Sequence, residues 1–153
     1  MKIAVIGSRT PSEASIKEVE KCLEYLIKKQ PDMVIITGGA YGMDTVGMEW
    51  GASHNVAVTV YTPQGYHNAI VCTKLEQEPR NKVVHTQLGF NQRNTCIIDE
   101  CDIVLVGDYG NGTIDAIVKA NMRKKQVYIF GKYIPGRYNR ELPRSEFIHF
   151  THM

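Results

Sequence analysis

The chain has 153 residues, of which 43% are hydrophobic and 22% are charged, and its formal net charge is +2. These values are typical of one soluble globular domain, and a charge of +2 is too small by itself to indicate a nucleic-acid partner. No apolar run approaches the roughly 20 residues of a membrane span. Because a strand-like segment begins directly after Met1, we expect a cytoplasmic protein without a signal peptide.

The cysteine and histidine residues form no pattern of a disulfide framework or a metal site. None of the four cysteines belongs to a CxxC pair, and a chain of this length does not need disulfides to fold, so we expect free thiols. His149 and His152 lie three residues apart, but no carboxylate or thiolate spacing accompanies them. We therefore expect neither a metal ion nor a bound cofactor.

Strand and helix patterns alternate from the amino terminus onward. Residues 2–7 are almost continuously apolar, which is typical of a strand buried on both faces. Ser12 is the predicted N-cap of an amphipathic helix that ends near residue 30. The same order then repeats, with a strand at 32–37, a helix from about Met43 to His54 and a strand at 56–61.

The regular pattern is interrupted from Thr62 to about Phe90, where we expect a long loop that acts as a functional lid or a mobile excursion. After this loop 62–90, Asn91 is a predicted helix cap. The elements that follow are a helix at 91–100, a strand at 102–107, a helix at 111–125 and a strand at 126–131. We expect a single domain with a core at 1–131 and a surface tail at 132–153, which has a short edge strand at 146–150.

This alternation with short joints predicts a parallel sheet with right-handed crossovers. We predict an α/β, Rossmann-like three-layer sandwich, in which a mostly parallel five-stranded sheet of order 3-2-1-4-5 carries helices on both faces. In that order the loops 7–9, 37–44 and 107–113 meet at the carboxyl edge of the sheet, where open parallel sheets bind ligands.

The loops at this edge have the residues of an anion site. Glycines let backbone N–H groups approach an anion, and the helix starts that follow add partial positive charge. Arg9 and Arg93 are the fixed cations expected to close the pocket. Asp44 either holds its own loop, which we favour, or accepts hydrogen bonds from sugar hydroxyls. Tyr41 and Tyr109 could stack on a base or be ordinary exposed loop residues.

Three motifs, "TGGAYGMD" (37–44), "NQRN" (91–94) and "GNGT" (110–113), lie in this order between the predicted strands. Together they resemble the SLOG superfamily, a Rossmann-like group that contains the cytokinin-activating phosphoribohydrolases and the DNA-processing protein A family. The resemblance covers Met1 to about Gly131 and is closest to small stand-alone members. It implies a ligand that carries a nucleotide or a ribose phosphate.

The predicted ligand-binding residues combine the loop argument with this resemblance. They are Gly7, Ser8, Arg9, Gly38, Gly39, Tyr41, Gly42, Asp44, Arg93, Asn94, Gly110, Asn111, Gly112, Thr113 and Asp115. The phosphoribohydrolases carry a catalytic Glu three residues after the Thr of the second turn, and this position is Ala116 here. Asp115 is one residue earlier, which turns its side chain by about 100° on a helix. Asp44, Glu100 or Asp108 could substitute for the missing acid, and the sequence favours none of them.

We therefore expect a protein that binds a nucleotide or an ADP-ribose-like metabolite as a sensor, carrier or sequestering protein. The alternative is a nucleotide N-glycosidic hydrolase or transferase. A second alternative is nucleic-acid binding of the DNA-processing type, which the missing basic and aromatic surface disfavours. A homo-oligomer is expected from an aromatic surface on the tail, formed by Tyr133, Tyr138, Phe147 and Phe150.

Overall fold

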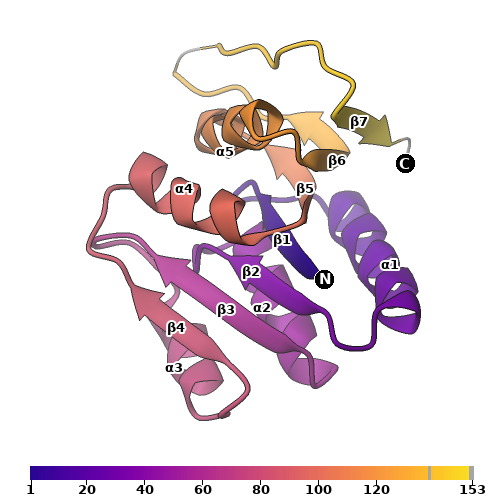
Figure 1. Ribbon diagram of the computed structural model, residues 1–153. Helices are drawn as coiled ribbons and strands as arrows, with labels where there is room; N and C mark the ends of the chain where they lie inside the picture. Colours follow the sequence, from indigo (N-terminus) through magenta and orange to yellow (C-terminus); the bar gives the residue numbers. More distant parts are fainter. Residues whose placement is uncertain (138, 152–153) are drawn as a thin grey trace.

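A parallel sheet of seven strands runs through the middle of the structure, a computed structural model that describes residues 1–137 and 139–151 (Figure 1). The strand order is β4-β3-β2-β1-β5-β6-β7, and each neighbouring pair is parallel. The strands are β1 (Lys2–Gly7), β2 (Val34–Thr37), β3 (Ala57–Thr62), β4 (Lys82–His85), β5 (Ile103–Tyr109), β6 (Gln126–Tyr133) and β7 (Ile148–Thr151).

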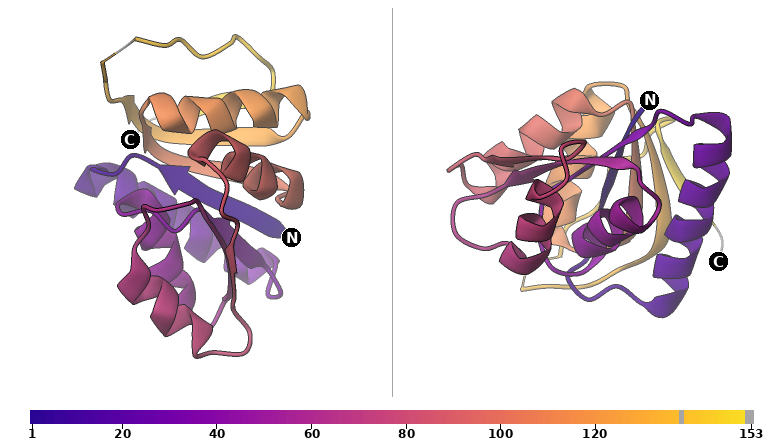
Figure 2. Two further views of the ribbon diagram at one scale, coloured as in Figure 1. Left: turned by 90° about the vertical axis from the view of Figure 1, so that its left-hand side faces the viewer. Right: turned by 90° about the horizontal axis from the view of Figure 1, so that it is seen from below.

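Helices cover both faces of the sheet (Figure 2). The helices are α1 (Glu13–Lys29), α2 (Met43–Ser53), α3 (Ala69–Glu76), α4 (Phe90–Glu100) and α5 (Asn111–Met122). One face packs against α1, α2 and α3, which bury Leu23 and Met48, whereas the other packs against α4 and α5, which bury Ile97 and Ile117. The predicted α/β sandwich of three layers is therefore confirmed.

The predicted sheet of five strands is wrong in size, although those five strands are neighbours in the expected sequence, as β3-β2-β1-β5-β6. Two edge strands extend it, β4 beside β3 and β7 beside β6. The two valines of β4 are only partly buried. Because an edge strand is covered less completely than a central one, β4 lacks the long apolar run that marks the central strands.

The segment 62–90 is not the long loop that we expected, since it contains α3 and β4. The side chain of Asn68 caps α3 by accepting a hydrogen bond from Val71 N at 3.4 Å. Cys72 and Leu75 are the buried residues of this helix. A helix of eight residues with two buried side chains has too few turns to produce a recognisable helical pattern.

The two predicted helix caps have different outcomes. Ser12 is the N-cap of α1, as predicted, and its side chain accepts a hydrogen bond from Ser15 N at 3.2 Å. The predicted cap Asn91 is wrong, because α4 begins at Phe90 with Gly89 as its N-cap. Glycine has no side chain to accept from the first-turn N–H groups, so the start of α4 has no side-chain cap.

The carboxyl-terminal segment is a crossover connection rather than a surface tail. Residues 134–137 leave β6 and residues 139–147 return to the sheet at β7, which confirms an edge strand close to the predicted 146–150 (Figure 1). Leu142 packs against the core under α5, and Ser145 Oγ donates a hydrogen bond to Asn121 Oδ1. A regular pattern was absent because this segment packs through single anchor residues. Tyr138 and His152 lie outside the described residues.

Three further features concern the residues that the structure describes. No helix in the described part of the chain has the length and apolar character needed to cross a bilayer. Across residues 1–137 and 139–151 there is no group of three or more His, Cys, Asp and Glu side chains suited to a metal ion. The four cysteines are free thiols, and burial raises the pKa of Cys72 and of Cys101 to about 11.

Asp108, at the end of β5, connects three parts of the fold. Its buried carboxylate accepts hydrogen bonds from Ser12 N at 2.8 Å and Ser15 Oγ at 2.9 Å, at the start of α1, and from Lys132 N in β6 at 2.8 Å. Burial raises the pKa of this carboxyl, but the hydrogen bonds outweigh that effect and hold the pKa below its usual value. The ionised carboxylate therefore stabilises the folded state.

We predict that Asp108→Asn lowers the free energy of unfolding by roughly 2–3 kcal/mol at pH 7, because an amide cannot replace the charged acceptor of three hydrogen bonds. A depressed folded pKa contributes stability above the unfolded pKa, and this contribution is lost as pH falls through the folded pKa. The difference between wild type and variant should therefore shrink below about pH 4. Guanidinium unfolding at pH 7 and pH 3 measures it, and a constant difference would contradict this account.

Candidate functional site

A cavity of about 490 Å³ opens at the carboxyl ends of β1 and β5. β1 lies between β2 and β5 in the sheet, and the helices that follow β1 and β5 cover opposite faces. This is the switch point at which open parallel sheets form ligand crevices. The predicted site residues that line the cavity are Gly7, Ser8, Arg9, Asp44, Arg93, Asn94, Gly110, Asn111, Gly112 and Thr113.

The start of α5 presents free hydrogen-bond donors in the wall of this cavity. Its N-cap, Gly110, has extended backbone (φ −110°, ψ −172°) and offers no side chain to the first turn. Gly112 N, Thr113 N and the Thr113 hydroxyl have no partner among residues 1–137 and 139–151. With the helix dipole, equivalent to roughly half a positive charge, donors of this kind are suited to an anion.

Arg93 supplies a fixed positive charge to the same cavity. It is buried, with 5% of its surface exposed, and its Nη1 donates to Gly38 O and to Tyr61 O, the latter at 3.1 Å. Nε donates to Asn94 Oδ1 at 3.2 Å. Within the described part of the chain, the two N–H groups of Nη2 have no partner. Burial lowers the pKa of Arg93, although an arginine stays protonated at neutral pH.

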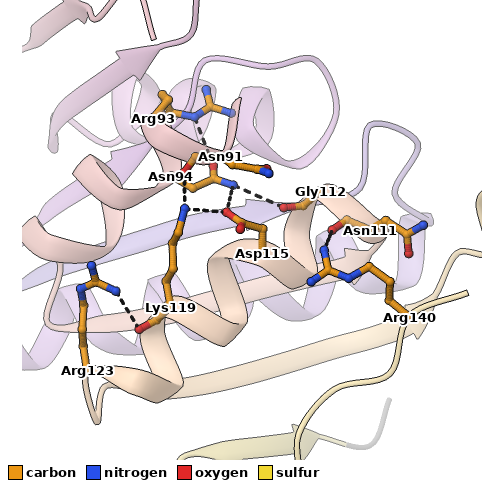
Figure 3. Close-up of polar contacts among 9 residues, drawn as sticks. All are labelled: Asn91, Arg93, Asn94, Asn111, Gly112, Asp115, Lys119, Arg123 and Arg140. Carbon is orange, nitrogen blue, oxygen red and sulfur yellow. Dashed lines mark hydrogen bonds and ion pairs between the residues drawn. The ribbon is translucent and has the colours of Figure 1, made fainter. Parts of the chain in front are cut away.

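Asn94 connects Arg93 to the start of α5 (Figure 3). While its carbonyl oxygen accepts from Arg93, its Nδ2 donates to Gly112 O at 3.4 Å and to Asp115 Oδ2 at 3.2 Å. Lys119 Nζ lies 2.9 Å from Asp115 Oδ2 and also donates to Asn91 O. These bonds hold α4 against α5. They therefore fix the position of the Arg93 guanidinium relative to the uncapped first turn of α5.

Asp115, a predicted ligand-binding residue, is not among the residues that line the cavity. Its carboxylate is occupied by Lys119 and Asn94. The predicted orientation, turned away from the position of Ala116, explains this placement: Ala116 lines the cavity and Asp115 faces α4. The position of Asp115 therefore favours a role in joining the two helices.

Asp44 lines the cavity and is buried. Its Oδ2 accepts a hydrogen bond from Ala40 N at 3.1 Å, which supports the interpretation that it holds its own loop. Burial raises the pKa of the Asp44 carboxyl, and the charge of Arg93 and the Ala40 hydrogen bond oppose this rise without cancelling it. A contact between Asp44 and a ligand sugar stays a prediction.

The glycines of the first turn lie outside the cavity lining. Gly38, Gly39 and Gly42, together with Tyr41, do not line the cavity. Gly42 has φ +87°, and a Cβ there would lie 2.4 Å from Ser8 O, so the turn packs tightly on the loop after β1. Two N–H groups of this turn are used internally: Met43 N donates to Ser8 O at 3.0 Å and Ala40 N donates to Asp44 Oδ2 at 3.1 Å. The free donors at the start of α5 lie in the cavity wall, whereas the glycines of the first turn do not line it.

Two parts of the cavity wall were not predicted. Phe90 lines the cavity from the first residue of α4, and Ile134, Pro135 and Gly136 line it from the start of the crossover segment. A signal for Phe90 was its position beside the "NQRN" motif. Nothing in the sequence placed residues 134–136 near Asn111, because this contact depends on the path of the crossover.

The sequence matches the model of the SLOG cluster 4 family over residues 1–151. The chain belongs to this family. Its resemblance to the SLOG superfamily is thereby confirmed. No curated protein matches the sequence significantly.

Solved structures with the same fold include two of DNA processing protein A. The Helicobacter pylori protein is 21% identical with a TM-score of 0.66, and the match covers 84% of this chain and 64% of that one. The Streptococcus pneumoniae protein is 23% identical with a TM-score of 0.68, and the match covers 84% of this chain and 49% of that one. The chain thus spans less than two thirds of either relative.

A structure of the Moco carrier protein from Chlamydomonas reinhardtii matches over more of its length. It is 15% identical with a TM-score of 0.71, and the match covers 99% of this chain and 88% of that one. Identities this low establish a common fold and leave the ligand open.

We predict that Asn94 and Asp115 act as a unit. Asn94→Ala and Asp115→Ala should each lower the free energy of unfolding by about 1–2 kcal/mol, because each leaves buried or half-buried polar groups without a partner. A double-mutant cycle by urea unfolding should give a coupling energy of about 1 kcal/mol. Strictly additive effects would show that the two side chains stabilise the helices independently.

Proposed function

We propose that this SLOG cluster 4 protein binds a nucleotide or an ADP-ribose-like phosphorylated metabolite in the cavity at the carboxyl ends of β1 and β5. It would act as a sensor, carrier or sequestering protein. The observation that carries the proposal is the pairing of free donors at Gly112 and Thr113 with the unused Nη2 group of Arg93 in the wall of one cavity.

The chemistry of these groups favours a phosphate. Backbone N–H groups at a helix start and a guanidinium both recognise phosphate oxygens, and a buried guanidinium is desolvated before the ligand arrives. Arg9 lines the cavity as well and adds a second positive charge. A volume of about 490 Å³ lies in the range of small-molecule pockets, which supports a ligand of nucleotide size.

The positions of the acidic residues favour binding over cleavage of a glycosidic bond. Ala116 occupies the place of the phosphoribohydrolase acid and cannot act on a ligand. Asp108 accepts three hydrogen bonds outside the cavity wall, and Glu100 accepts one from Tyr61. Asp44 is the one acid among the described residues that lines the cavity. Release of free base from nucleotides that Asp44→Asn abolishes would contradict a binding role.

The similar structures include proteins of both kinds. The Chlamydomonas reinhardtii protein carries the molybdenum cofactor, whereas the Helicobacter pylori protein binds single-stranded DNA. For this chain, a single cavity lined by two arginines and a net charge of only +2 support a small molecule over a long polyanion. Assembly into a homo-oligomer belongs to the proposal too, supported by Phe150, which is 59% exposed on the edge strand β7.

We predict that Thr113→Val weakens the binding of adenosine monophosphate about fivefold and that Arg93→Ala weakens it at least tenfold, because each removes a phosphate donor. Binding of adenosine should change little, since it has no phosphate. Isothermal titration calorimetry measures both affinities, and thermal unfolding reports whether each variant is folded.

Arg123→Ala is the matched control for Arg93→Ala. Arg123 ends α5 at its far end, where it pairs with Asp99 at 2.5 Å and does not line the cavity. This variant should leave both affinities unchanged. Equal losses of affinity for the phosphorylated and unphosphorylated ligands in the Thr113 or Arg93 variant would contradict the assignment of a phosphate to this end of the cavity.

A further inference from the structure

Three exposed aromatic rings form a group beside the cavity, and two of them contact Arg9. The ring centroids of Tyr41 and Tyr66 are 5.6 Å apart, and those of Tyr66 and Phe90 are 6.3 Å apart. Arg9 Cζ lies 4.1 Å from the centroid of Tyr66 and 5.3 Å from that of Phe90. We call this group, Arg9 with Tyr41, Tyr66 and Phe90, the aromatic rim.

The aromatic rim is continuous with the predicted phosphate site. Arg9 and Phe90 both line the cavity. Phe90 also links the two arginines, because its centroid lies 5.3 Å from Arg9 Cζ and 5.5 Å from Arg93 Cζ. A ligand with its phosphate at the start of α5 would therefore have its other end within reach of Phe90 and Arg9.

The loops that carry the rim are held in place by hydrogen bonds of their own. Asn68 N donates to Gly39 O at 2.7 Å, and Gln64 N donates to Leu88 O at 2.7 Å. These backbone bonds hold the loops without a contribution from the rings. The rings of Tyr66 and Phe90 are 36% and 37% exposed. Exposed rings grouped beside a cavity are typical of a binding surface.

We propose that the aromatic rim binds the flat heterocycle of the ligand, so that the ligand class is a nucleoside phosphate or a similar phosphorylated heterocycle, and a sugar phosphate alone binds weakly. This inference rests on the proposed function. Aromatic ring faces and the planar guanidinium of Arg9 can stack on any flat heterocycle. Stacking therefore gives affinity for a flat ring without selecting one base.

The arrangement favours a single heterocycle over a nucleic-acid strand. Binding of a strand requires stacking surfaces that follow one another along a positively charged groove. Elsewhere in the described part of the chain, the large exposed aromatic residues are Tyr25 on α1 and Phe150 on β7. They lie on other elements and do not extend the rim, which ends at one cavity.

The test compares ligands with and without a heterocycle in wild type and variants. The probes are adenosine, guanosine and uridine monophosphates and ribose 5-phosphate, measured by isothermal titration calorimetry. We expect wild type to bind at least one nucleotide about tenfold or more tightly than ribose 5-phosphate. Tyr66→Ala and Phe90→Ala should each lower the nucleotide affinity about tenfold and leave the ribose 5-phosphate affinity unchanged.

Two further variants separate stacking from charge and from general effects. Arg9→Lys keeps the positive charge but loses the planar group, so it should reduce nucleotide affinity more than ribose 5-phosphate affinity. Tyr25→Ala is the matched control, since Tyr25 is an exposed tyrosine with a lysine, Lys29, 5.8 Å from its ring, far from the cavity lining. It should change neither affinity.

The outcomes distinguish this inference from the proposed function. Equal affinity of wild type for nucleotides and ribose 5-phosphate, or equal losses for both in the rim variants, would overturn the inference and leave phosphate binding intact. Failure of wild type to bind any phosphorylated probe would overturn both. Tight binding of a single-stranded oligonucleotide that weakens steeply with salt, with weak binding of every mononucleotide, would overturn the inference in favour of a strand.

Discussion

The site depends on one buried guanidinium. Arg93 is removed from water between the ends of β2 and β3, and a charge in such a place is costly unless it is hydrogen-bonded. Two backbone carbonyls and Asn94 satisfy three of its N–H groups. The positions of Gly38, Asn94 and, through Asn94, the first turn of α5 follow from this requirement. The cavity is therefore shaped around a charge that the chain itself leaves partly unsatisfied.

The remaining charge of Arg93 supports the proposal that an anionic group of the ligand binds there. Asp44 is the nearest acid in the cavity wall, but burial raises its pKa and its Oδ2 is engaged by Ala40 N. Each carboxylate elsewhere in the neighbourhood is occupied, as Asp115 is by Lys119. A phosphate between Arg93 and the start of α5 would complete the hydrogen bonding of both, so a single ligand group compensates two desolvation costs.

Much of this arrangement could be predicted from the sequence, because it depends on short loops that follow strongly apolar strands. The order of the central strands, the cations Arg9 and Arg93 and the glycine turn before α5 were found in this way. The edge elements α3 and β4 were missed because partly exposed elements carry weak patterns. The aromatic rim and the crossover at 134–147 join residues far apart in the chain, and no local pattern encodes such contacts.

The two glycine turns show that a glycine-rich turn between a strand and a helix does not by itself identify an anion site. Both follow a strand and open a helix, yet Gly42 is required for packing against Ser8 while the turn at Gly110 leaves donors free. Close approach requires glycine only in the first of these turns, since a Cβ at Gly110 would lie 3.8 Å from Ile134 O and one at Gly112 would meet no atom within 4 Å.

The most direct measurement is a crystal structure of the protein with adenosine monophosphate bound. The account predicts phosphate oxygens at about 3 Å from Gly112 N, Thr113 Oγ1 and Arg93 Nη2. A phosphate held instead by the turn at Gly38–Gly42, or bound outside the cavity, would contradict it.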